Sequence, residues 1–179
     1  MTQPPRPTHR PPHLDLEAGC YWLTAATLHR QPLLTTAAHR QVWRTALRAL
    51  TAETGVALHA WVVLPNHYHV LFERAPQLTL SQWVKRLHGR TAQQLNRLDA
   101  TPGRQVWYNY WDTVIRGERD FWTRVNYVHY NPVKHGYVAD PAAWPFSSYG
   151  YYRRTQGADW LAGQHAAYPP PSALAHDEF

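Results

Sequence analysis

Hydrophobic and polar positions in the first third of this chain predict a strand followed by a helix. Residues 19–28 are rich in aromatic and β-compatible side chains, which is typical of a strand. Residues 37–54 have helical spacing, with Thr35-Thr36 available as a cap and Gly55 as a stop. On this helix we expect a buried stripe formed by Val42, Ala46, Leu47, Ala49 and Leu50.

The next segment predicts a β-hairpin. Two β-rich runs, residues 56–64 and 67–73, are separated by the turn signal Pro65-Asn66. Because side chains alternate along a strand, His67 and His69 should share one face. The opposite face should carry Tyr68, Val70 and Phe72.

Two further helices are expected after the hairpin. Thr79 or Ser81 can cap the first, which should run to about Leu98. Its apolar side should carry Leu80, Trp83, Val84, Leu87, Ala92 and Leu95, and its other face carries Lys85, Arg86, His88, Arg90 and Arg97. The second should begin at Glu118 and end near Asn131 or kink at Pro132. Residues 105–115 between them predict one or two short strands or an aromatic-lined loop.

The order of these elements favours an α+β fold with helices packed on an antiparallel sheet. We expect one folded domain over residues 19–150, preceded by a mobile basic, proline-rich arm over residues 1–18. Residues 151–179 have no clear period, and we expect an irregular C-terminal tail there.

Composition narrows the class of protein. The 179 residues are 44% hydrophobic, enough to build one core, and carry a net charge of +6 with a pI near 9.7. This excess favours a polyanionic partner, although a ribosome-associated or membrane-surface protein would have a similar charge. The single cysteine, Cys20, excludes an internal disulfide, and no apolar run reaches membrane-spanning length. We therefore expect a cytoplasmic protein.

The pair His67 and His69 is a candidate metal site, but the spacing alone is weak evidence. With 12 histidines among 179 residues, about one His-x-His pair is expected by chance. Surface or core histidines are the alternative.

A second motif strengthens this interpretation. The two segments in question are Leu64-Pro65-Asn66-His67-Tyr68-His69 and Tyr127-Val128-His129-Tyr130-Asn131-Pro132-Val133-Lys134-His135-Gly136. Together they resemble the single-tyrosine HUH transposases, and most closely the REP-associated tyrosine transposases. The segment Trp144-Pro145-Phe146-Ser147-Ser148 is also similar to that family, and the resemblance runs from about Gly19 to Tyr149.

The resemblance implies a ferredoxin-like HUH nuclease fold and an enzyme that cuts and rejoins single-stranded DNA near palindromic hairpins. It implies Mg²⁺ or Mn²⁺ as cofactor, Tyr127 as the nucleophile that forms a 5′-phosphotyrosine, and His67, His69 and Asn131 as metal ligands. It also favours a monomer, with a dimer as the alternative.

The chemistry of these residue types agrees with those roles. A tyrosine that attacks a phosphodiester conserves the energy of the bond. On a helix, Tyr127 and Asn131 at i and i+4 share one face. Two imidazoles and one amide oxygen leave coordination positions open for water and phosphate oxygens, which suits Mg²⁺ or Mn²⁺ better than structural zinc.

Several residue assignments stay open. Tyr130 competes with Tyr127 as the nucleophile, whereas His129 should point away from the site and His135 would reach it only if the chain turned back. Lys134 could contact a phosphate or the phenolate, or be an ordinary solvated lysine. Further DNA-binding candidates are Arg116, Arg119, Lys85, Arg86 and Arg90, for which a solvated helix face is the alternative.

Two rival functions follow from these alternatives. A catalytically silent hairpin nucleic-acid-binding protein would keep the fold and lose the chemistry. A metallohydrolase that uses metal-bound water would cleave DNA without Tyr127.

Overall fold

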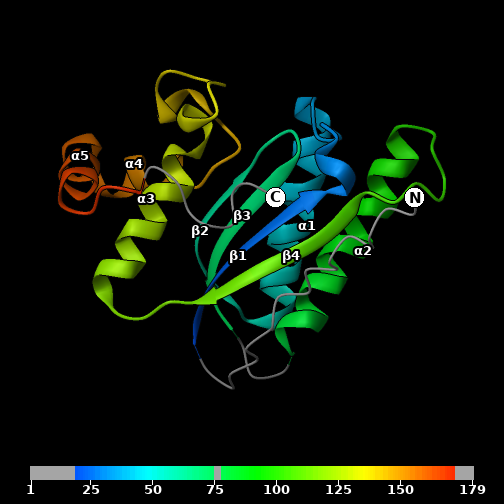
Figure 1. Ribbon diagram of the computed structural model, residues 1–179, viewed down its shortest axis with the longest axis horizontal. Helices are drawn as coiled ribbons and strands as arrows, with labels where there is room; N and C mark the ends of the chain where they lie inside the picture. The colour runs from blue at the N-terminus through cyan, green and yellow to red at the C-terminus, as the bar shows by residue number, and fades with distance from the viewer. Residues whose placement is uncertain (1–18, 75–77, 172–179) are drawn as a thin grey trace, which may run out of the picture.

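A four-stranded antiparallel sheet forms the centre of the molecule in the computed structural model, which describes residues 19–74 and 78–171 (Figure 1). The strands are β1 (Cys20–Thr27), β2 (Ala57–Val63), β3 (His67–Glu73) and β4 (Trp107–Val114). Their order in the sheet is β2-β3-β1-β4. With the helices between them, this order is the expected ferredoxin-like α+β arrangement, so the predicted fold class is confirmed.

Two long helices cover one face of the sheet. They are α1 (Ala37–Thr54) and α2 (Leu80–Leu98), and each begins with a capping box, on Thr36 and Thr79 respectively. The core beneath them takes alternate residues of β3, namely Tyr68, Val70 and Phe72. The predicted division of β3 into two faces is therefore confirmed.

The predicted stripe on α1 was partly wrong. Ala46, Leu47 and Leu50 are buried, but Ala49 is exposed, and Trp43, which the predicted stripe left out, is fully buried. Ala49 lies about 120° round the helix from Trp43, which faces the core and packs against Tyr68 with ring centroids 4.8 Å apart.

The helix α3 (Glu118–Lys134) covers the other face and extends past Pro132. Of the two predicted alternatives, an end near Asn131 is therefore wrong, and the helix continues through the proline. Pro132 lacks the backbone N–H that would donate to the carbonyl four residues earlier, yet the helix continues for two residues beyond it. The final turn is held by the His135 N–H, which donates to the Asn131 carbonyl at 3.1 Å. Consequently Lys134 stays on the helix.

The C-terminal segment is helical rather than irregular, which corrects the prediction for residues 151–167. After a 3₁₀ turn (Pro141–Ala143), α4 (Tyr149–Gln156) and α5 (Ala158–Ala167) pack beside α3 (Figure 1). The amide of Asn126 on α3 donates to the carbonyls of Gln164 and Tyr168 and fixes the end of α5. The predicted N-terminal arm lies outside the described residues.

Residues 144–148 close the free edge of β2. Val63 N–H donates to the Phe146 carbonyl at 3.0 Å, and Ser148 N–H donates to the Trp61 carbonyl at 2.9 Å. Covering an edge in this way removes unpaired backbone groups from solvent. Within the described residues, no helix is long and apolar enough to cross a membrane.

Candidate functional site

His67 and His69 lie at the start of β3, on the face that α3 covers. Their ring centroids are 5.0 Å apart with the planes nearly perpendicular. His69 is fully buried and His67 partly so. The two imidazoles therefore meet in one place, as the strand period predicted.

Each imidazole is oriented through its Nδ1 atom. Asn66 Oδ1 lies 2.7 Å from His67 Nδ1, and Thr24 Oγ1 on β1 lies 2.7 Å from His69 Nδ1. Trp22 stacks on the His69 ring at 5.5 Å and 10°. Fixing Nδ1 in this way favours Nε2 as the nitrogen that binds a ligand.

Burial keeps both imidazoles neutral at pH 7. It lowers the pKa of His67 to about 3, helped by the nearby charge of His135 and opposed by the contact with Asn131. Burial also holds the pKa of His69 well below its ordinary value, with His67 adding to the effect. A neutral imidazole retains the lone pair that a metal ion requires.

Tyr127 and Asn131 face these histidines from α3, one helical turn apart. The Tyr127 ring meets His69 edge-on at 5.5 Å, and Asn131 Oδ1 lies 3.3 Å from His67 Nε2. Both α3 side chains are almost completely buried. The residues drawn from the two sequence motifs thus converge on one site.

Lys134 completes the contact with Tyr127. Its Nζ donates a hydrogen bond to the Tyr127 hydroxyl at 2.9 Å and lies 4.9 Å from the centre of the same ring. This geometry requires α3 to continue past Pro132. A cation beside a phenolic oxygen favours the ionised form of the phenol over the neutral one.

The donor set fits a divalent metal ion. If Nδ1 of neutral His67 donates to Asn66, its Nε2 carries a lone pair. That lone pair faces Oδ1 of Asn131, so two acceptors meet with no proton between them. A cation bound between His67 Nε2 and Asn131 Oδ1 would satisfy both. Asn131 Nδ2 is buried with no hydrogen-bond partner in the described part of the chain. Within residues 19–74 and 78–171, no group of three or more His, Cys, Asp or Glu side chains is placed to hold a metal. A third protein ligand beside the two imidazoles would therefore be the Asn131 amide, whose Oδ1 lies 3.3 Å from His67 Nε2.

His135 is a site residue that the sequence did not predict. Its ring lies 5.0 Å from that of His67, and the side chain is exposed. The position depends on α3 reaching Lys134, after which the chain turns at Gly136 with φ of 72°. The sequence feature that could have indicated this position is that His135 directly follows Lys134, which was already a candidate site residue.

Tyr130 and His129 lie away from this group. Tyr130 stacks on His165 of α5 at 3.8 Å, and His129 Nε2 lies 2.9 Å from the Ser148 hydroxyl. The geometry therefore places Tyr127 beside the histidine pair and Tyr130 elsewhere.

The remaining basic candidates are remote from the histidine pair. Lys85, Arg86 and Arg90 lie on α2, which covers the opposite face of the sheet, and Arg90 forms a bidentate pair with Glu53. Arg116 and Arg119 lie at the opposite end of α3 from Asn131. Arg124 is nearer, with its guanidinium 4.4 Å from the centre of the Trp22 ring.

Comparisons with known proteins give a consistent result. The family model described as "Transposase IS200 like" matches residues 18–131. The chain is 28% identical over 136 residues to the REP-associated tyrosine transposase of Escherichia coli, which covers 75% of this chain and 78% of that protein. It is 30% identical over 98 residues to a Haemophilus influenzae protein whose name assigns it provisionally to the same group, covering 49% and 55% of the two chains.

A solved structure shares the fold. It is a REP-associated tyrosine transposase bound to a REP hairpin, with a TM-score of 0.68 and 24% identity over 84% of this chain and 88% of that chain.

Proposed function

Because this chain belongs to the IS200-like transposase family, we propose that it is a metal-dependent enzyme that cleaves and rejoins single-stranded DNA beside palindromic hairpins. The observation that supports this most strongly is the convergence of two contacts on one site: Lys134 with Tyr127, and Asn131 with His67. The hairpin is proposed as substrate because the structural relative was solved with one bound.

The metal ligands in this proposal are Nε2 of His67, Nε2 of His69 and Oδ1 of Asn131. When bound, Mg²⁺ or Mn²⁺ supplies Lewis-acid polarisation of the scissile phosphate. The ordered Nδ1 contacts to Asn66 and Thr24 hold the imidazoles for this role.

Tyr127 is the proposed nucleophile. Its phenolic oxygen forms the bond to phosphorus and loses its proton, while the bond from phosphorus to the 3′ oxygen breaks and that oxygen takes up a proton. The product is a 5′-phosphotyrosine together with a free 3′-hydroxyl that can reverse the reaction. Lys134 stabilises the developing phenolate through its 2.9 Å contact.

The test is formation of a covalent adduct. The protein is incubated with a labelled single-stranded oligonucleotide containing a hairpin, with Mn²⁺ or Mg²⁺, and separated on a denaturing gel. We expect wild type and Tyr130→Phe to form a protein–DNA adduct and Tyr127→Phe to form none. Tyr130→Phe is the matched control because it removes a hydroxyl from the same helix, three residues away.

Other outcomes would replace the proposal. Hairpin binding without cleavage, unchanged by chelator and by Tyr127→Phe, would indicate the silent DNA-binding protein. Cleavage that survives Tyr127→Phe would indicate attack by metal-bound water. Because one chain supplies both Tyr127 and His69, a monomer is proposed, and adduct formation on mixing His67→Ala with Tyr127→Phe chains would contradict it.

A further inference from the structure

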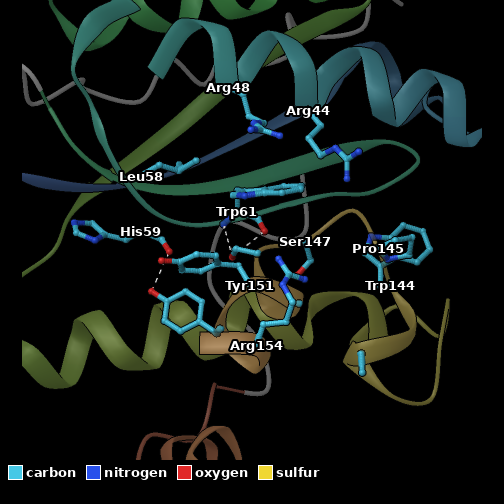
Figure 2. Close-up of a pocket in the computed structure, with 14 residues that line it drawn as sticks. Arg44, Arg48, Leu58, His59, Trp61, Trp144, Pro145, Ser147, Tyr151 and Arg154 are labelled. Atoms are coloured by element: carbon cyan, nitrogen blue, oxygen red, sulfur yellow. Dashed lines mark hydrogen bonds between the residues drawn. The ribbon is translucent and has the colours of Figure 1, made fainter. Parts of the chain in front are cut away.

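A second concave surface lies at the edge of the sheet, away from the histidine pair. It is a cavity of about 850 Å³ bounded by α1, β2 and the segment that includes residues 144–154 (Figure 2). Arg44 and Arg48 reach into it from α1, and Arg154 reaches into it from α4 on the opposite side.

The charge of this cavity is entirely positive. None of its lining residues is Asp or Glu, and none of the three arginines forms an ion pair within residues 19–74 and 78–171. Arg44 donates to the Gln41 amide oxygen, and its Nε is buried with no hydrogen-bond partner in that same part of the chain. Guanidinium groups gathered without carboxylates attract phosphates, which they can bind through two parallel hydrogen bonds.

Aromatic rings line the same cavity. Trp61 lies between the arginines of α1 and that of α4, Trp144 lies at one end, and Tyr151 is 60% exposed (Figure 2). Rings that stack bases, combined with cations that meet phosphates, are the components of a single-strand-binding groove. The bases of a duplex are stacked on one another and are not available to such rings.

A series of rings connects the histidine pair with this cavity. The His135 ring lies 5.0 Å from His67, Tyr137 lies 6.3 Å from His135, and Trp144 lies 5.5 Å from Tyr137. Tyr137 is 42% exposed, and the Arg40 guanidinium lies 4.9 Å from the Trp144 ring. The rings therefore form a continuous path from the histidine pair to the cavity, along which His135 and Tyr137 are exposed and Trp144 is partly buried.

We propose that this path holds the single-stranded flank of the DNA, with its bases on Tyr137, Trp144 and Tyr151 and its phosphates on Arg44, Arg48 and Arg154. This inference rests on the proposed function, because it takes hairpin DNA with an unpaired flank as the substrate. The cavity binds the flank, while the hairpin stem binds elsewhere.

The experiment measures binding without chemistry. Fluorescence anisotropy in EDTA compares one hairpin with no flank, with a 5′ flank and with a 3′ flank, each flank about ten nucleotides long, within the range that single-strand grooves cover. We expect one flank to raise the affinity of the wild-type protein by about tenfold or more.

Paired variants locate the contact. Arg48→Gln/Arg154→Gln should remove the gain from the flank, whereas Arg97→Gln/Arg153→Gln should keep it. Both pairs remove two positive charges from exposed positions, but Arg97 and Arg153 do not line the cavity. Loss of two phosphate contacts should also reduce the slope of log affinity against log salt by about 1.4, at about 0.7 per contact with single strands.

The stacking contact is tested by Tyr151→Ala against Tyr108→Ala, a similarly exposed tyrosine on β4 outside the cavity. We expect at least about fivefold weaker binding of the flanked hairpin for Tyr151→Ala only. The inference is overturned if no flank raises affinity, or if the two double variants lose affinity equally. Failure of the proposed function appears separately, as absence of the Tyr127 adduct despite binding that depends on the flank.

Discussion

Burial of the histidine pair determines what these residues can do. A buried imidazolium is costly, so His67 and His69 remain neutral and keep their lone pairs over the whole physiological pH range. The same burial would disfavour a phenolate at Tyr127, and the charge of Lys134 opposes that penalty. The histidine pair has to stay neutral, which burial favours. Tyr127 would have to carry a negative charge, which the neighbouring Lys134 favours.

Lys134 gives the residue-scale prediction. Lys134→Ala should slow adduct formation by about a hundredfold at pH 7, because the developing phenolate loses the cationic hydrogen-bond donor beside it. The loss should shrink as pH rises, since free phenols ionise near pH 10. Single-turnover rates across pH, with hairpin affinity measured in EDTA, test this.

The comparison of rate with affinity distinguishes two roles of Lys134. A residue that acts on the phenolate should change the rate while affinity changes little, and Lys134→Arg should recover part of the rate. If rate and affinity fall together at every pH, Lys134 contacts a phosphate in the ground state instead.

At the scale of elements, the molecule depends on how its C-terminal segment closes the edge of β2. Ser148 carries this contact, because its hydroxyl accepts from the Trp61 backbone N–H at 3.0 Å and lies 2.9 Å from His129 Nε2 on α3. One small side chain therefore joins the sheet, α3 and α4. The same junction positions one wall of the arginine-lined cavity.

Ser148→Ala should lower the free energy of unfolding by about 1–3 kcal/mol, because the Trp61 N–H loses its acceptor and the buried His129 Nε2 loses its hydrogen-bond partner. Urea denaturation measures the change, with Ser81→Ala at an exposed position of α2 as the control. A loss no greater than that of Ser81→Ala would show that water replaces the hydroxyl at this junction.

Local patterns were sufficient for the elements that have regular periods. The hairpin, α1 and α2 were predicted within a residue or two because their caps, stops and alternating positions are adjacent in the sequence. The helices α4 and α5 were missed because tertiary contacts hold them, such as the Asn126 amide bound to the carbonyls of Gln164 and Tyr168. Partners so far apart in sequence leave no periodic signal.

The site was predictable to a similar extent. His67, His69, Tyr127 and Asn131 were found as motif residues, and the structure brings their side chains together. His135 was not found, since its position depends on whether α3 passes Pro132, which local rules leave open. The cluster of arginines in the cavity could not be predicted from local patterns, because α1 and α4 are about a hundred residues apart in sequence. They come together only where the C-terminal segment closes the edge of β2.

On the scale of the whole molecule, the sheet separates the main hydrophobic core from the candidate site at the histidine pair. The core under α1 and α2 contains most of the large buried side chains, and α3 with the histidine pair lies on the other side. Partly or fully buried histidines nevertheless occur on both sides, and this couples overall stability to pH. His88 on α2, far from the site, lies against Tyr68 and Trp107.

The pH dependence of unfolding follows from these buried histidines. Burial lowers the pKa of His67, His88 and His129 to about 3, whereas an unfolded chain binds these protons near pH 6.5. Between those values only the unfolded state gains protons, so the free energy of unfolding must fall as pH falls. For His88 alone the loss from pH 7 to pH 5 should be up to about 2 kcal/mol.

Urea denaturation of wild type, His88→Asn and His29→Asn at pH 7 and pH 5 checks this contribution. The exposed His29 is the control, and asparagine tolerates its positive φ of 52°. His88→Asn should be less stable than wild type at pH 7, because Tyr68 loses the partner of its hydroxyl, yet it should lose less stability on acidification. An unchanged difference between pH 7 and pH 5 would mean that His88 is protonated in the folded protein, with its ring accessible to water.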